Sequence, residues 1–339
     1  MSASARGHSA LWRWWLLTRP AGLWLPPLLP LLGYGWAHWD RALLAYHPEA
    51  LLPVLLAWVA LQAGTLWLNA ARDRDQGEVL LGQAVTVPPG TSLLGYAGLA
   101  VAVLLAVIAG VVPGLCALGA AALAVLYSHP ATAWKGHPVL GPAVNLVGYG
   151  ILSPVAGYAV VGAPPTWRSL ATLAILAVAV LGWTFISQAF QQDEDRSRGD
   201  RTLVATHGPR IALTAGRICL GTAAAILSIL VLAGWYPAEV ALALVGALLT
   251  DRALRRWARE LTGGERRARR VLVLGVLTLA LAVGGALIDY GIDSATGGPV
   301  AGLATRAGMP SDRIARPAAE QIVRDVRHRE LTGASYRPN

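Results

Sequence analysis

A short polar segment interrupts the apolar sequence at Asn69-Ala-Ala-Arg72-Asp73-Arg74-Asp75-Gln76-Gly77-Glu78. No carboxylate follows Glu78 until Asp193, which belongs to a second polar segment, Gln188-Ala-Phe-Gln191-Gln-Asp193-Glu194-Asp195-Arg-Ser-Arg198-Gly199-Asp200-Arg201-Thr202-Leu203. Carboxylates at the ends of membrane helices are costly to retain and mark functional sites by default. We therefore expect the two segments to hold a divalent metal against a phosphorylated substrate.

The composition is that of a membrane protein. Hydrophobic residues make up 55% of the chain and charged residues 14%, and the mean hydropathy is +0.50, whereas soluble domains contain about 25% charged residues. Cys116 and Cys219 lie in apolar runs, which excludes a disulfide framework and a zinc-ligand spacing. The net charge of +9 lacks the basic and aromatic interleaving of nucleic-acid-binding proteins. The composition therefore predicts a lipid bilayer, and no nucleic acid, as the partner.

Apolar runs recur along the chain at lengths near the 20 or so residues that a transmembrane helix needs. They cover residues 20–37, 50–68, 92–112, 114–127, 139–162, 168–190, 210–234, 236–250 and 271–291. Pro113 alone divides the third run from the fourth, so eight spans remain an alternative to nine. The first run lacks a small-residue cleavage site, and we interpret it as a retained helix. The predicted fold is all-α and polytopic, with about nine transmembrane helices.

The distribution of basic residues predicts the orientation of these helices. With the N-terminus in the cytoplasm, the connections after the second, fourth, sixth and eighth runs share that side. They contain the first polar segment, Lys135, the second polar segment and an arginine-rich loop at residues 251–270. The opposite connections carry only Arg41 and Arg168. The positive-inside rule therefore predicts cytoplasmic motif loops in a bacterial-type inner membrane.

The C-terminal tail differs from the rest of the chain. Residues 1–291 are predicted to form the transmembrane domain, and residues 292–339 a polar tail. Apolar residues spaced among charges at residues 311–331 indicate one amphipathic helix in this tail.

Polar side chains recur at helical spacing toward both polar segments. On the second predicted helix they are Gln62, Thr65, Asn69, Asp73 and Gln76, and on the sixth they are Thr184, Gln188, Gln191 and Asp195. Two such stripes can face each other across a cavity, with carboxylates at its mouth. Carboxylate and amide oxygens suit Mg²⁺, which completes its coordination with water and substrate phosphate. The candidate metal ligands are Asn69, Asp73, Asp75, Gln188, Gln191 and Asp195.

Lys135 is the only lysine of the chain and lies in a loop on the same predicted face, Tyr127-Ser-His129-Pro130-Ala-Thr-Ala-Trp-Lys135-Gly-His137-Pro138. An ammonium group is a good phosphate partner; anchoring by the positive-inside rule is the alternative interpretation. We interpret His129 and His137 as structural. Four arginines are further candidate phosphate ligands: Arg72, Arg74, Arg198 and Arg201.

The predicted fifth helix carries a polar stripe of its own, Asn145, Tyr149 and Ser153. These residues either line the cavity or join helices by polar contacts. The spacing leaves both interpretations open.

Taken in order, these motifs resemble those of the UbiA-type intramembrane prenyltransferase superfamily, over about residues 19–290. The family pattern Asn-Asp-x-x-Asp-x-x-x-Asp corresponds to Asn69, Ala70, Asp73 and Gly77, and Asp-x-x-x-Asp ahead of Gly-x-Arg-Thr-Leu corresponds to Gln191 and Asp195. The loop with tyrosine, serine, proline and lysine corresponds to Tyr127, Ser128, Pro130 and Lys135, and Arg19-Pro20 fits the pair before the first helix. The resemblance implies nine helices around a central cavity open to lipid, with both acidic motifs at cytoplasmic helix ends. It also implies prenyl transfer from a diphosphate to an aromatic acceptor.

Three positions depart from the family pattern. Ala70, Gly77 and Gln191 stand where the family has aspartates. Asp75 and Glu78 are candidate replacements in the first motif, and Asp193 is one in the second. The chain therefore looks like a divergent branch.

Our hypothesis is a magnesium-dependent transfer of a prenyl group from a prenyl diphosphate to a lipophilic or aromatic acceptor within the membrane. Asp73, Asp195 and Lys135 are the predicted catalytic residues. Tyr127 and Asn145 join Lys135 and the four arginines as candidate ligands of the diphosphate.

Two other functions fit the same residues. One is a membrane terpene cyclase on the same scaffold, in which the allylic cation is captured within the same molecule. The other is a non-catalytic lipid or ion transporter, or a binding protein, because three metal-motif positions are altered.

Overall fold

The long apolar runs form long helices in the computed structural model, which describes residues 9–41, 48–73, 80–82, 84–162, 164–262 and 264–296. Eight of the runs form the helices α2 (Leu25–Arg41), α3 (Pro48–Asp73), α4 (Thr91–Ala109), α5 (Val111–Ser128), α8 (Trp167–Gln188), α11 (Pro209–Leu232), α12 (Ala243–Glu260) and α13 (Gly264–Thr296). The fifth run forms three consecutive segments, α6 (Leu140–Asn145), the π-helical η4 (Leu146–Leu152) and α7 (Ser153–Ala159). The described residues contain no strand, and the predicted all-α fold is confirmed.

Seven of these helical segments are long and apolar enough to cross a membrane, counted over the described residues. The two that fall outside this group are α2, which has 17 residues, and α12, whose second half is rich in arginine. The chain is therefore an integral membrane protein, and the count of nine spans stays a prediction.

A single glycine separates α4 from α5. Gly110 ends α4 with φ 142° and directly precedes α5, whereas Pro113 lies within the first turn of α5. This backbone conformation is accessible to glycine and strained for other residues. The third and fourth runs are therefore two helices, divided by Gly110 and not by the proline.

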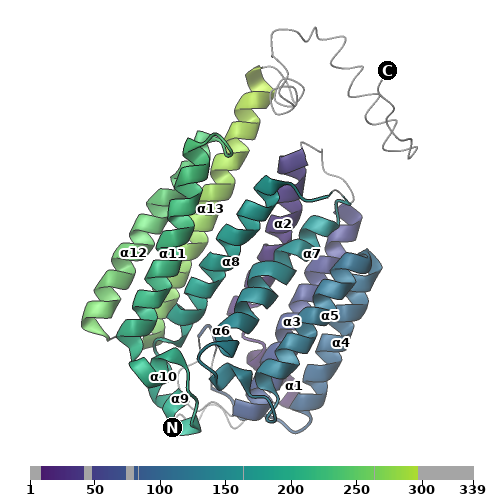
Figure 1. Cartoon of the computed structure of the whole chain (residues 1–339). Helices are drawn as coiled ribbons and strands as arrows, with labels where there is room; N and C mark the ends of the chain where they lie inside the picture. The colour runs from purple at the N-terminus through teal and green to yellow at the C-terminus, as the bar shows by residue number, and fades with distance from the viewer. Residues whose placement is uncertain are drawn as a thin grey trace.

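The helices form a bundle (Figure 1), and its buried residues make up two apolar cores. One core is built from α2, α3, α4, α5 and α7, and the other from α8, α11, α12 and α13. Small residues allow the closest contacts: Gly64 of α3 lies against Gly98 of α4, and Gly33 of α2 lies against the backbone of Pro154 in α7. Such small-residue contacts let membrane helices approach closely where lipid provides no hydrophobic driving force.

The contact between α2 and α7 leads to a stability prediction for Gly33→Ala. A Cβ atom at residue 33 would lie 1.9 Å from the Pro154 carbonyl oxygen, so the two helices must separate. We expect a loss of about 1–3 kcal/mol, the usual cost of overpacking a core, measured as a lower thermal unfolding temperature in detergent. Gly35→Ala on the same helix is the control, because a Cβ atom there has nothing within 4 Å. Equal unfolding temperatures for Gly33→Ala and the wild type would contradict this packing.

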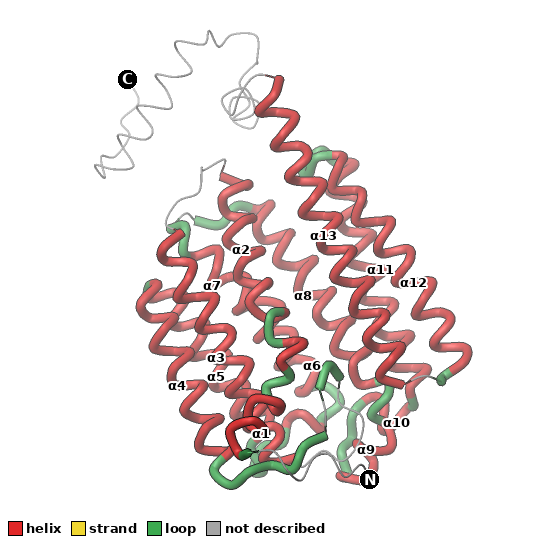
Figure 2. Tube along the Cα trace, turned by 180° about the vertical axis from the view of Figure 1, so that it is seen from behind, coloured by secondary structure: helices red, strands yellow, loops and turns green. Residues whose placement is uncertain are grey.

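The segments with candidate functional residues gather at one end of the bundle. The C-terminal end of α3, the loop between α5 and α6, and the short helices α9 (Gln192–Arg198) and α10 (Leu203–His207) lie at the lower end in Figure 1 and again in the reverse view of Figure 2. The C-terminal end of α12 and the N-terminal end of α13 also lie at this end of the bundle. This is the grouping that the charge distribution predicts.

The prediction of an arginine-rich loop at residues 251–270 is wrong. These residues belong mostly to α12 and α13, which are separated only by residues 261–263. Ion pairs at i,i+4 spacing, such as Asp251 with Arg255 and Glu265 with Arg269, stabilise the helices beyond the apolar region. The charged residues are therefore part of α12 and α13 and not of a loop.

Candidate functional site

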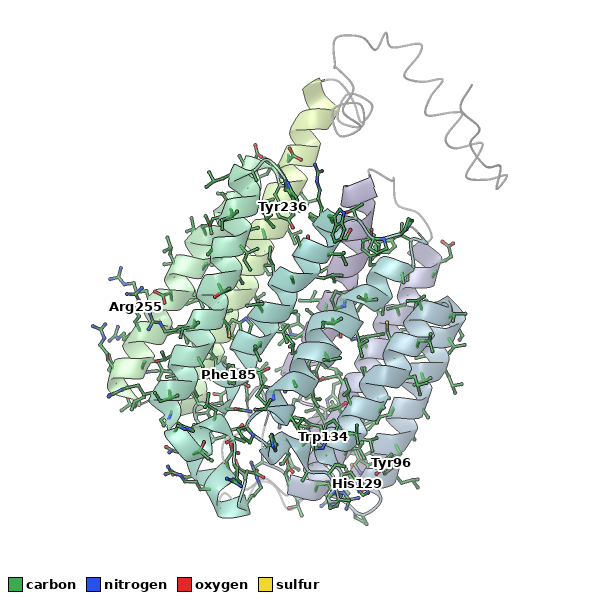
Figure 3. The ribbon with its side chains drawn as sticks, in the orientation of Figure 1. Tyr96, His129, Trp134, Phe185, Tyr236 and Arg255 are labelled. Carbon is green, nitrogen blue, oxygen red and sulfur yellow. The ribbon has the colours of Figure 1, made fainter. Side chains whose placement is uncertain are left out.

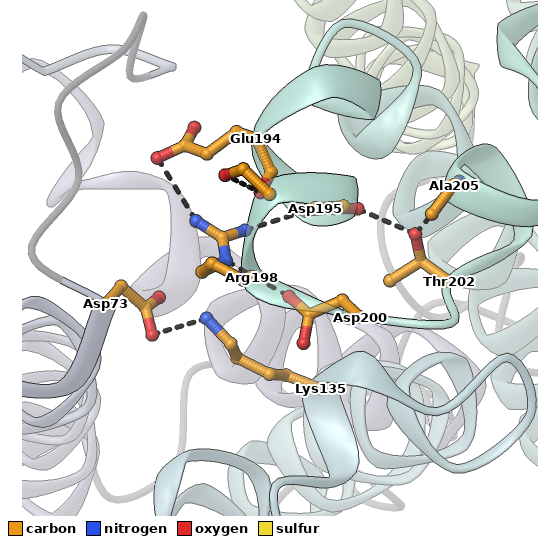
Figure 4. A network of polar contacts seen from close by, with 9 residues as sticks. Asp73, Lys135, Glu194, Asp195, Arg198, Asp200, Thr202 and Ala205 are labelled. Atoms are coloured by element: carbon orange, nitrogen blue, oxygen red, sulfur yellow. Dashed lines mark hydrogen bonds and ion pairs between the residues drawn. The ribbon is translucent and has the colours of Figure 1, made fainter.

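The first polar segment contacts the loop at residues 129–139, between α5 and α6, through an ion pair. We call this loop the lysine loop. Asp73 is the last residue of α3, and its carboxylate contacts the ammonium group of Lys135 (Figure 4). Lys135 lies in the 3-10 turn η3 (Trp134–Gly136), between α5 and α6. Both side chains are mostly buried, with exposed fractions of 16% for Lys135 and 14% for Asp73. Two of the three predicted catalytic residues are therefore in direct contact.

The second polar segment docks on the same loop. The backbone N–H of Arg201 donates to the carbonyl oxygen of Gly136 at 2.7 Å. Gly136 also lies against Asp200, since a Cβ atom at residue 136 would be 2.4 Å from the Asp200 Oδ1 atom. The loop thus contacts Asp73 on one side and the second polar segment on the other, which brings three distant parts of the sequence together.

Arg198 holds three carboxylates of the second segment with one guanidinium group (Figure 4). Its Nη1 lies 3.1 Å from Glu194 Oε1, its Nη2 2.7 Å from Asp195 Oδ1, and its Nε 3.0 Å from Asp200 Oδ2. The planar fork of an arginine can satisfy several oxygens in fixed directions, which a lysine cannot do. Arg198 therefore determines how these carboxylates are arranged.

Thr202 fixes the other oxygen of Asp195. Its hydroxyl donates to Asp195 Oδ2 at 2.6 Å and accepts from the backbone N–H of Ala205 at 3.2 Å, which makes Thr202 the N-cap of α10. Gly199, with φ 76°, turns the chain between α9 and Asp200. The run Gly199-Asp-Arg-Thr-Leu203 thus provides a turn, a carboxylate and a helix cap around Asp195.

Burial raises the pKa of Asp195, which is 3% exposed. The Thr202 hydrogen bond and the charges of Arg198 and Lys135 act in the opposite direction, while the charge of Asp200 raises the pKa further. Burial lowers the pKa of Arg198, but the bond to Asp200 and the charges of Asp73, Asp195 and Asp200 outweigh it, so the net pKa is raised. Arg198 therefore stays cationic, and it lies within electrostatic reach of both polar segments.

Tyr127, Asn145 and Asn69 border this network. Tyr127 lies within electrostatic reach of Asn145, Asp73, Asp195 and Asp200. Asn69 accepts a hydrogen bond from Ser128, the neighbour of Tyr127. These predicted residues are therefore brought to the site.

The expected polar stripe on the sixth span is interrupted. Helix α8 ends at Gln188, and Gln191 is the N-cap residue of the separate helix α9, which carries Asp195. Gln188 is 7% exposed, and its Oε1 atom has no hydrogen-bond partner within the part of the chain that the structure describes. A buried acceptor without a partner is costly unless a ligand satisfies it.

Several predicted residues do not join the network. The side chains of Arg72, Arg201 and Asp193 are exposed, and Arg201 contributes only its backbone. Arg74, Asp75, Gln76, Gly77 and Glu78 lie outside the described residues. Conversely, Glu194, Asp200, Thr202 and Gly136 are in the network although no role was predicted for them; only the cap pattern of Thr202 before Leu203 was visible in the sequence.

On the fifth run, the structure favours helix–helix contacts. Tyr149 donates to Gln62 of α3 at 2.6 Å, and Ser153 accepts from Trp58 of α3 at 2.6 Å and donates to the Gly148 carbonyl. A π-helical turn such as η4 is often found at functional sites, and here it includes Tyr149 and ends next to Ser153.

The donor set fits a magnesium ion that takes few protein ligands. Among the described residues, no three His, Cys, Asp or Glu side chains form a metal-binding group. Mg²⁺ is commonly held by one or two carboxylates together with substrate phosphates. The carboxylate of Asp73 is a ligand of this kind, and the amide oxygen of Gln188, which has no hydrogen-bond partner among the described residues, can add a neutral oxygen ligand.

In a comparison with known protein families, residues 25–268 match the UbiA prenyltransferase family. The chain belongs to this family. The fold is shared with a UbiA homologue from Archaeoglobus fulgidus bound to GPP and Mg²⁺, with 18% identity, a TM-score of 0.57 and coverage of 81% of this chain and 99% of that one. A UbiA homologue from Aeropyrum pernix K1 gives 21% identity, a TM-score of 0.56 and coverage of 78% and 97%.

A third similar structure is described as digeranylgeranylglyceryl phosphate synthase in membranes. It has 12% identity, a TM-score of 0.53 and coverage of 82% of this chain and 98% of that one. No curated protein sequence matches the chain. Membership in the UbiA family supports a prenyltransferase activity in general, and the resemblance inferred from the motifs is confirmed.

Proposed function

We propose that the protein transfers a prenyl group from a prenyl diphosphate to a lipophilic or aromatic acceptor within the membrane, in a magnesium-dependent reaction. The observation that carries this proposal is the contact of Asp73 with Lys135 next to the Arg198 network. This contact brings an ammonium group and carboxylate groups together at one end of an apolar bundle, which supports a site for a metal-bound diphosphate.

In this proposal, Asn69, Asp73, Asp75, Gln188, Gln191 and Asp195 are the candidate metal ligands. When bound, Mg²⁺ would neutralise the diphosphate and make it a better leaving group. Lys135 binds the diphosphate oxygens, together with the Tyr127 hydroxyl and Asn145, while Arg198 holds the carboxylates of the second polar segment beside them. Because Lys135 pairs with Asp73 in the structure, a phosphate that takes over Lys135 also releases the Asp73 carboxylate for the metal.

The reaction breaks the bond between the prenyl carbon and the diphosphate oxygen, and the electron pair leaves with the diphosphate. The acceptor then forms the new bond to the prenyl carbon and loses a proton. The apolar side chains of the bundle exclude water from the allylic cation in the meantime. The homologues from A. fulgidus bound to GPP and to DMAPP with Mg²⁺ support this class of substrate.

We further propose that the end of the bundle carrying the site faces the cytoplasm, in a bacterial-type inner membrane. The arginine-rich ends of α12 and α13 lie at the same end as the site, which supports this orientation.

The proposal is tested with the purified protein in nanodiscs and a panel of prenyl diphosphates. We expect diphosphate release that requires Mg²⁺ and stops with a chelator, and a prenylated acceptor in the mass spectrum. A released cyclic hydrocarbon or alcohol without any acceptor would instead identify a cyclase. Absence of both diphosphate release and Mg²⁺ binding would favour a transporter or binding protein.

The docking of the lysine loop leads to a prediction for Gly136→Ala. The added methyl group would collide with Asp200, which Arg198 holds in place, so Lys135 must move. We expect the catalytic efficiency for the prenyl diphosphate to fall between about 10- and 100-fold, because small displacements of a positioned group have effects of this size. Gly221→Ala in α11 is the control, since a Cβ atom there has nothing within 4 Å. An unchanged efficiency in Gly136→Ala would show that this contact does not position Lys135.

A further inference from the structure

A strongly basic surface lies at the same end of the bundle as the candidate site but on other helices, where α12 ends and α13 begins. Residues 251–270 contain eight arginines and three carboxylates, a net charge of +5. Arg210 and Arg217 of α11 adjoin it, through a hydrogen bond of Arg210 Nε to the Ala258 carbonyl and an ion pair of Arg217 with Asp251. We call residues 251–270 together with these two arginines the arginine surface.

The three carboxylates of the arginine surface are already paired. Asp251 is held by Arg217 and Arg255, Glu260 by Arg256 and Arg267, and Glu265 by Arg269. The four remaining arginines are exposed, and their side chains form no ion pair or hydrogen bond with any part of the chain that the structure describes: Arg252, Arg259, Arg266 and Arg270. Within the described residues, these four guanidinium groups therefore have no counter-ion.

An exposed apolar band adjoins these arginines. On α12, Val245 is 54% exposed and Leu248 71% exposed, one to two turns before Arg252. On α13, Val273 is 61% exposed, less than one turn after Arg270. In an integral membrane protein such a band contacts acyl chains, so the arginines adjoin it at the level of the lipid headgroups.

The arginine surface and the candidate site use different elements. The site is built from α3, the loop between α5 and α6, and α9, whereas the arginine surface is built from α11, α12 and α13. Figure 3 shows Arg255 at the outer edge of the bundle, well separated from Trp134, which precedes Lys135 in the lysine loop. The arginine surface therefore does not serve the diphosphate site directly.

We propose that the arginine surface binds the phosphate groups of anionic phospholipids. Guanidinium groups bind phosphate oxygens in pairs of parallel hydrogen bonds. The exposed arginines lie beside a band that contacts acyl chains. A phospholipid fits this arrangement, because its phosphate group is attached directly to its acyl chains through glycerol. A soluble anion has no acyl chains to contact the band. Anionic headgroups also attract basic residues near the membrane surface electrostatically. This proposal does not depend on the enzymatic activity.

The test measures lipid retention by native mass spectrometry of the purified full chain, with equal amounts of phosphatidylglycerol and phosphatidylcholine. We expect the wild type to retain phosphatidylglycerol at least about tenfold more than phosphatidylcholine, since several arginines act together. The combined variant Arg252→Gln, Arg259→Gln, Arg266→Gln and Arg270→Gln should lose most of this preference. A variant with lysine at the same four positions keeps the positive charge and should keep part of the preference for phosphatidylglycerol.

The controls separate the lipid from other anions and from misfolding. Arg168→Gln, at the opposite end of the bundle, should leave the lipid preference unchanged. Inorganic phosphate at the concentration of the lipid should not displace phosphatidylglycerol, because it lacks acyl chains; displacement would show a site for free phosphate. Equal retention of both lipids by the wild type, or an unchanged preference in the glutamine variant, would overturn the proposal. An unchanged unfolding temperature shows that the glutamine variant is folded.

Discussion

Replacing Asp73 by asparagine is expected to lower the rate of magnesium-dependent diphosphate release by about 10³-fold, which corresponds to about 4 kcal/mol in the activation barrier. Asparagine keeps the shape of the side chain and removes its charge. The variant therefore loses the proposed metal ligand and the carboxylate that contacts Lys135. The measurement is diphosphate release at saturating prenyl diphosphate, together with the affinity for Mn²⁺ as a probe of the metal site.

The Asp73→Asn experiment has a matched control in Glu239→Gln. Glu239 lies in η5 (Ala238–Leu242), between α11 and α12 at the other end of the bundle, so the same chemical change there should leave both measurements unaltered. A wild-type rate in Asp73→Asn, at equal protein levels, would remove Asp73 from the mechanism. A reduced rate with unchanged Mn²⁺ affinity would assign Asp73 to the positioning of Lys135 alone.

The features that the sequence predicts well are those fixed by local composition. Apolar runs must become helices in lipid, because only a helix satisfies its own backbone hydrogen bonds there. The helices therefore appear at the runs, and the polar segments at their ends, as expected. The contact of Asp73 with Lys135 also agrees with the prediction that both residues lie on one face.

The features that the sequence does not predict depend on contacts between distant residues. Asp200 and Gly136 lie 64 positions apart in the chain, and no local pattern shows that one packs on the other. The break between α8 and α9 places Asp195 on a separate short helix, where Thr202 and Arg198 hold it. Helical spacing predicted one continuous helix carrying the polar stripe from Gln188 to Asp195. This prediction of the local structure is wrong, because α8 ends at Gln188.

The role of Arg198 also depended on tertiary structure. The sequence suggested a phosphate ligand, whereas the structure shows its three nitrogens engaged with Glu194, Asp195 and Asp200. Three aspartates of the family pattern are replaced in this chain, and three of the four acids of the second segment are paired with Arg198. The guanidinium group of Arg198 is therefore engaged with carboxylates in the structure.

Replacing Arg198 by lysine is expected to lower diphosphate release by about 10²-fold or more, although the charge is retained. A lysine offers one nitrogen where Arg198 offers three in fixed directions, so it cannot hold three carboxylates at once. Asp195, which is buried, would keep its bond to Thr202 but lose its directed contact with the guanidinium group. Because a single ammonium group cannot rebuild all three contacts, we also expect a lower unfolding temperature.

The measurements for Arg198→Lys are the release rate, the Michaelis constant for the prenyl diphosphate and the unfolding temperature in nanodiscs. If Arg198 acts only as a positive charge toward the diphosphate, lysine should restore most of the activity that Arg198→Ala loses, with little change in unfolding temperature. If Arg198 arranges the carboxylates, lysine and alanine should be similarly inactive, because neither rebuilds the three contacts. Arg168→Lys at the far end of the bundle is the control and should match the wild type. The geometry around Arg198 favours the second outcome, and a fully active lysine variant would contradict it.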